Sequence, residues 1–123
     1  MAEAEEDLAA ARDMTEIGRF KWAVFAARQA VEQALKGAYQ AAKRLEAPHV
    51  HGLRQLARET FEEVPDEVSD LLRSLDPLYT ISRYPSVLAS RPSEQYTEDD
   101  ARDYVRAAAE VISWISERLS EMS

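Results

Sequence analysis

Three groups of polar residues in this chain have types and spacings that could do chemistry. The first comprises Gln29, Glu32 and Lys36, which follow one another at intervals of three and four residues. Residues spaced in this way share one face of a helix. Glu32 and Lys36 also stand in the order that favours an ion pair along a helix. The spacing is therefore consistent with a solvated salt bridge and equally with a polar seam or binding face.

The second group is the pair of histidines, His49 and His51, the only two in the sequence. Histidine titrates near neutral pH and can transfer protons. No histidine–carboxylate motif for a metal accompanies them, and the chain has no cysteine, so we predict neither a metal site nor a cofactor. His51 also precedes Gly52 at an expected helix start, where it could cap the helix or satisfy a buried carbonyl.

The third group is Arg83-Tyr84-Pro85. An arginine beside a proline-stiffened turn presents a planar guanidinium that suits a phosphate or a carboxylate. Alternatively, Arg83 ties its loop to an acidic residue nearby, such as Asp76. Both interpretations stay open.

These groups belong to a chain of 123 residues, of which 46% are hydrophobic and 31% charged. This composition is typical of a globular protein, and we expect one domain over residues 1–123. The acidic start lacks the pattern of a signal peptide, and no apolar run approaches the ~18 residues that cross a bilayer. We therefore expect a cytoplasmic protein with no membrane contact.

The net charge of −8 is unevenly distributed. Residues 18–58 carry eight basic and two acidic residues, which gives this segment a charge of +6. This segment is either an anion-binding surface or a set of solvated helix faces.

The elements that must position these residues are helices. Apolar residues at 20, 24, 27, 31, 34, 38 and 42 predict a long helix over 20–45 with one buried face. Gly18 ends an acidic first helix over 3–17, and Pro48 forces a loop. Shorter helices are expected over 53–63 and from Asp66, a predicted N-cap, to about 75. Thr97 opens the last long helix with a near capping box. The sequence thus predicts an all-α, up-and-down bundle of four to five helices, two of them long.

Several stretches, in this order, resemble the HEPN family of small helical proteins. They are Asp7-Leu8, the run from Phe25 to Lys36, His51-Gly52-Leu53, Arg83-Tyr84-Pro85 and the segment 98–101. The resemblance covers nearly the whole chain. It implies a helical bundle that forms homodimers and is paired with a minimal nucleotidyltransferase, often as the toxin half of a toxin–antitoxin system.

Many HEPN proteins are metal-independent ribonucleases whose motif is an arginine, four to six residues and a histidine near the last long helix. Here the corresponding segment runs from Arg91 to Tyr96, with tyrosine in place of histidine. Arg44 precedes His49 and His51 at permitted spacings, but after the second helix, which is the wrong place. Whether the protein is an enzyme is left open.

Our leading hypothesis is a HEPN-type module that interacts with a nucleotide or RNA. The residues predicted to contact the nucleotide, its phosphate or the partner are Arg83, Tyr84, His51, Lys36, Gln29 and Glu32. One alternative is an active ribonuclease toxin, with His51, Arg91 and Tyr96 as the catalytic candidates. The other is a structural dimerisation or adaptor protein.

Overall fold

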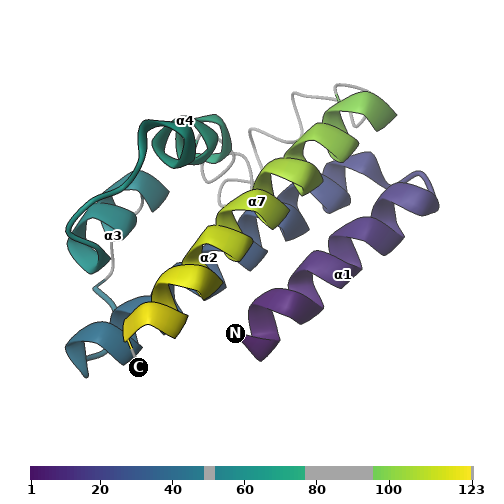
Figure 1. Cartoon of the computed structure of the whole chain (residues 1–123). Coiled ribbons are helices and arrows are strands. Elements are labelled where there is room, and N and C mark those ends of the chain that lie inside the picture. Colours follow the sequence, from purple (N-terminus) through teal and green to yellow (C-terminus); the bar gives the residue numbers. More distant parts are fainter. Residues whose placement is uncertain (49–51, 77–95, 123) are drawn as a thin grey trace.

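The computed structural model describes residues 1–48, 52–76 and 96–122 (Figure 1). These residues contain five α-helices and no strand, so the predicted all-α fold is confirmed. The helices are α1 (Ala2–Glu16), α2 (Phe20–Lys43), α3 (Leu53–Thr60), α4 (Asp66–Leu75) and α7 (Glu98–Met122).

The three longest helices lie side by side, and the shorter α3 and α4 cover one flank of them (Figure 1). Helix α2 contacts α1, α3 and α7, and α4 packs on α7. Helices α2 and α7 run in the same direction, while α1 runs opposite to both (Figure 1). Consequently the start of α2 and the start of α7 meet at one end of the bundle.

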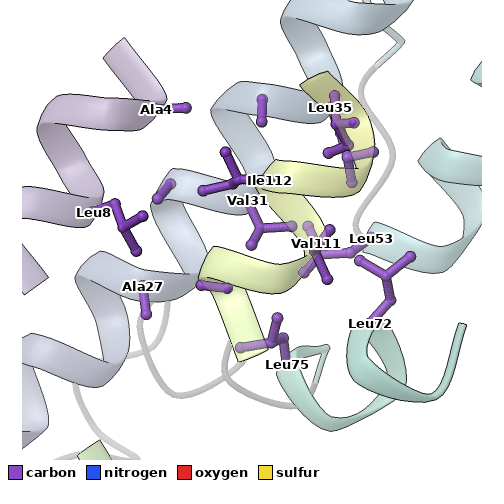
Figure 2. Packing of buried hydrophobic residues seen from close by; sticks show 14 of the residues in the cluster. Ala4, Leu8, Ala27, Val31, Leu35, Leu53, Leu72, Leu75, Val111 and Ile112 are labelled. Atoms are coloured by element: carbon purple, nitrogen blue, oxygen red, sulfur yellow. The ribbon is translucent and has the colours of Figure 1, made fainter. Parts of the chain in front are cut away.

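The centre of the bundle is α2. Its predicted apolar stripe is buried at Val24, Ala27, Val31, Ala34 and Ala38. Because α2 has neighbours on several sides, residues outside that stripe are also buried. Figure 2 shows side chains from these neighbours meeting around the middle of the helix. Each fully buried leucine or valine there contributes roughly 1.5–3 kcal/mol through removal from water.

The helix ends follow local backbone geometry. Gly18 adopts a φ of 81°, which ends the first helix as predicted. Helix α2 stops at Lys43, two residues before the predicted end, because Arg44 turns into the left-handed region with a φ of 57°. Helix α3 stops at Thr60 because Phe61 is extended, and its ring packs edge-on against Trp114 with centroids 4.8 Å apart.

The helix starts show one confirmed cap and one wrong prediction. The backbone N–H of Asp100 donates to Thr97 Oγ1 over 3.1 Å, and the N–H of Thr97 donates to Asp100 Oδ2 over 3.0 Å. This is the predicted capping box, with aspartate as its acid. Asp66 is not an N-cap: α4 begins at Asp66, and Pro65 precedes it without a side-chain cap. Asp66 instead lies in the first turn, where its charge complements the helix dipole.

Candidate functional site

The polar face of α2 contains a buried network of three charged residues. Arg28 Nη1 donates to Glu32 Oε1 over 2.5 Å, and Lys36 Nζ donates to Glu32 Oε2 over 2.9 Å. The Arg28 side chain is only 4% exposed and that of Glu32 10% exposed, whereas that of Lys36 is 40% exposed. The network therefore runs from the interior of the bundle to a half-exposed ammonium group at the surface.

The hydrogen bonds determine the charge state of Glu32. Burial by itself would raise the pKa of this carboxyl group, because it disfavours the charged form. The hydrogen bonds and charges of Lys36 and Arg28 outweigh burial, so the pKa of Glu32 is lowered. Glu32 is thus an anion at neutral pH, and it fixes the positions of both cations.

A groove of about 320 Å³ runs between α1 and α2 beside this network. Asp7 and Met14 line it from α1. The lining from α2 consists of Trp22, Phe25, Ala26, Arg28, Gln29 and Glu32. The groove therefore combines four apolar side chains with four polar or charged ones.

Asp7 is the carboxylate on the α1 side of this groove. Partial burial raises the pKa of Asp7, and the charges of Glu3 and Glu6 raise it further. No ion pair within the described ranges involves Asp7. Its oxygens thus differ from those of Glu32, both of which accept a hydrogen bond from a cation on their own helix.

Aromatic rings continue from the groove to the start of α7. Trp22, which is 47% exposed, meets Phe25 edge to face with centroids 6.0 Å apart. Phe25 meets Tyr96 in the same manner at 6.3 Å. Lys21 Nζ lies 4.8 Å from the centroid of a Trp22 ring, within the range of a cation–π contact. An exposed aromatic and a cation therefore stand together at one end of the groove.

A second groove, of about 410 Å³, lies between α1 and α7. Its cationic lining consists of Arg12, Arg102 and Arg106. Arg102 pairs with Glu98 at 2.9 Å and with Glu16 at 3.4 Å, and Arg106 pairs with Asp103 at 3.3 Å. Acidic neighbours thus offset much of this positive charge, and we do not take this groove as the candidate site.

The structure places the predicted site residues as follows. Glu32 and Lys36 share the network on α2, and Gln29 is exposed and lines the groove. Tyr96 is half-buried against Phe25. The other predicted residues lie outside the described part of the chain: His51, Arg83, Tyr84 and Arg91.

Asp76 was predicted as an alternative partner of Arg83. In the structure it follows the C-terminal end of α4 and has a structural role there. Asp76 Oδ1 accepts a hydrogen bond of 2.5 Å from the backbone N–H of Leu53, the first residue of α3. This contact caps α3 from a residue 23 positions later and ties the two short helices together.

The set of predicted site residues left out Arg28, Asp7 and Trp22. Arg28 stands four residues before Glu32, so the helical period would have found it. Asp7 and Trp22 come from the packing of α1 on α2, and no local pattern places them beside that face.

Two features are absent from the described residues. Among them, no three histidine, cysteine, aspartate or glutamate side chains gather as a metal site requires. No helix in the described ranges has both the length and the apolar character needed to cross a membrane.

Comparison with known proteins identifies the class. A family model of the HEPN domain matches residues 1–119, so the chain belongs to the HEPN domain family. TT1696 from Thermus thermophilus is a similar solved structure, with 29% identity and a TM-score of 0.81 over 94% of this chain and 92% of that one. ST0689, an archaeal HEPN homologue, has 30% identity and a TM-score of 0.79 over 96% and 93% of the two chains. Among curated proteins no match was found.

Proposed function

We propose that this chain is a HEPN-type module that binds a nucleotide or RNA at the groove between α1 and α2. The observation that carries this proposal is the Arg28–Glu32–Lys36 network, whose two buried members, Arg28 and Glu32, lie in the wall of that groove. Buried ion pairs add little stability compared with apolar side chains of similar size. A function in binding therefore supplies a reason for keeping three charged groups there.

Each group of the network has a chemical role in this proposal. The half-exposed ammonium of Lys36 contacts a phosphate, and Glu32 holds that ammonium in place. Arg28, which is almost fully buried in the wall of the groove, acts by positioning Glu32. Exposed Gln29 offers an amide to a base edge or a ribose. By their chemistry, we assign further phosphate or partner contacts to Arg83, Tyr84 and His51.

We extend the proposal to assembly. Membership of the HEPN family supports a homodimer that is paired with a minimal nucleotidyltransferase as one half of a toxin–antitoxin system. The test is expression of the chain alone and together with its neighbouring gene product. Growth arrest that the neighbour relieves supports the pairing, and unaffected growth in both cases contradicts it.

We prefer binding without cleavage as the activity, because Tyr96 stands where the ribonuclease motif has a histidine. A phenol is a poor general base at neutral pH, so it does not replace the histidine of the ribonuclease motif in that role. Its ring packs against Phe25 instead. Cleavage of RNA by the pure protein without metal would favour the ribonuclease alternative.

A matched pair of lysine variants tests the site. Lys36 and Lys43 lie on the same helix, but only Lys36 belongs to the network, and Lys43 is exposed at the end of α2. We expect Lys36→Met to weaken binding of a short single-stranded RNA about tenfold and to lower the salt dependence by about one phosphate contact. Lys43→Met should change affinity less than twofold. Equal losses in both variants would contradict a defined site, and unchanged binding in both would support the adaptor alternative.

A further inference from the structure

We propose that the α1–α2 groove selects guanine, with the Asp7 carboxylate accepting hydrogen bonds from guanine N1–H and the 2-amino group. The inference rests on the nucleotide binding proposed above and adds the identity of the base. Its starting point is the difference between the two carboxylates that line the groove. Both oxygens of Glu32 accept hydrogen bonds from cations on α2. Asp7, which also lines the groove, forms no ion pair in the described part of the chain, and we assign its two oxygens to the ligand.

The acceptor geometry of a carboxylate favours guanine over the other bases. An ionised carboxylate has two acceptor oxygens and no donor, and paired N–H donors can bind it in a bidentate manner. Guanine presents two adjacent donors on its Watson–Crick edge, the N1–H and the 2-amino group. Adenine and cytosine present one amino group beside a ring-nitrogen acceptor, which a carboxylate repels. Uracil presents a single N–H between two carbonyl groups.

The remainder of the groove suits the faces of a flat heterocycle. The apolar part of the lining consists of Met14, Trp22, Phe25 and Ala26. Stacking of a base on an exposed aromatic ring is favourable for every base, so these residues supply affinity without selecting the base. The volume of about 320 Å³ is at the lower end of the range for small-molecule pockets. The groove therefore suits a single nucleotide.

The charged residues around the groove suit a nucleotide with an anionic phosphate and a neutral base. The cations Lys21 and Lys36 lie on either side of the polar and aromatic lining, on α2. A phosphate would meet one of these two ammonium groups beside the groove, while the base meets Asp7 inside. Partial burial beside Glu3 and Glu6 leaves the Asp7 carboxylate poorly stabilised. Two N–H donors from a ligand would compensate for that loss of hydration.

Calorimetric titration with GMP, IMP, AMP, CMP and UMP tests the selection, with the UUGUU and UUAUU pentamers as the RNA source of the same bases. We expect GMP to bind about tenfold more tightly than AMP. IMP, which keeps N1–H but lacks the 2-amino group, should lie between them. Asp7→Asn should reduce GMP affinity about tenfold and should not weaken AMP, because the amide can pair with the amino group and ring nitrogen of adenine. The control is Asp13→Asn, an exposed aspartate on the same helix, which should change neither affinity.

The outcomes separate this inference from the function on which it rests. If GMP, AMP, CMP and UMP bind within twofold of one another, and UUGUU and UUAUU do so as well, guanine selection is wrong and nucleotide binding stands. If Asp7→Asn weakens AMP as much as GMP, the contact assigned to Asp7 is wrong. If no nucleotide or pentamer binds, the proposed function fails together with this inference. Preference for UUGUU over UUAUU without a matching preference among free nucleotides would assign the groove to RNA and keep guanine as its base.

Discussion

Replacement of Glu32 by glutamine tests how much the buried ion pair between Arg28 and Glu32 contributes to stability. Glutamine keeps the size of the side chain but removes the negative charge that faces Arg28, whose side chain is 4% exposed. Breaking a buried ion pair by removal of one partner costs about 3–5 kcal/mol. Because glutamine can still accept one hydrogen bond, we expect Glu32→Gln to lower the free energy of unfolding by about 3 kcal/mol.

Loss of the Lys36–Glu32 pair should lower the free energy of unfolding less than loss of the Arg28–Glu32 pair. Lys36 is 40% exposed, so water screens its pair with Glu32. We expect Lys36→Met to cost only about 0.5 kcal/mol, as an exposed helical pair does. The double variant Arg28→Met, Glu32→Met removes both buried charges together. Its cost should fall short of the sum of the two single costs by at least about 2 kcal/mol, which measures the coupling of the pair.

Urea unfolding followed by circular dichroism and tryptophan fluorescence measures these values. For a chain of this length, a loss of 3 kcal/mol corresponds to a fall in Tm of about 10 °C. The reasoning would be refuted if Glu32→Gln cost less than about 1 kcal/mol, or if Lys36→Met cost as much as Glu32→Gln.

The pH dependence of the same variant gives an independent check. The pKa of Glu32 is lowered in the folded protein, so folding gains from its ionised form. This contribution is complete above the ordinary glutamate pKa of about 4.3 and is lost as the pH falls through the lower folded-state value. The stability difference between the wild type and Glu32→Gln should therefore be constant near neutral pH and shrink below about pH 4.

Three further substitutions test the helix ends, each by urea unfolding. Thr97→Ala removes the side chain that accepts from Asp100 N–H and should cost about 1 kcal/mol, with Thr97→Ser restoring most of it. Asp76→Ala removes the acceptor for Leu53 N–H and should cost about 1–2 kcal/mol, while Asp76→Asn, which keeps a carbonyl oxygen, should cost less. Gly18→Ala meets no steric clash but must hold a φ of 81°, so it should cost about 1 kcal/mol, and a neutral result would contradict the role of this residue as a helix stop.

Local features of the fold could be predicted from sequence because they depend on neighbours along the chain. The stripe of α2 and the capping box at Thr97 are set by residues three and four apart. The predicted helix ends were less accurate. Helix α2 ends because Arg44 adopts the left-handed region, and arginine as a residue type gives no signal of that conformation. Asp66 was misplaced because an acidic residue suits both the N-cap and the first turn.

The candidate site could be predicted only in part, for a different reason. Glu32 and Gln29 are three residues apart on one predicted face, yet Glu32 is buried and Gln29 is exposed. That difference depends on how neighbouring helices cover α2, which the helical period does not contain. The contact of Asp7 with the groove and that of Asp76 with Leu53 likewise join residues from different helices. Such contacts follow from the topology of the whole bundle.

The double variant Arg28→Met, Glu32→Met also distinguishes a structural role of these two charges from a role in binding. If Arg28 and Glu32 were kept for stability, replacing both by methionine should be costly, and binding should fail only with folding. Because apolar pairs replace buried ion pairs with little loss, we expect the double variant to remain folded. Lys36 would then lose the carboxylate of Glu32, a residue of the groove wall, that holds its ammonium in place. A folded double variant with weakened nucleotide binding therefore indicates that α2 keeps its interior charge to position Lys36.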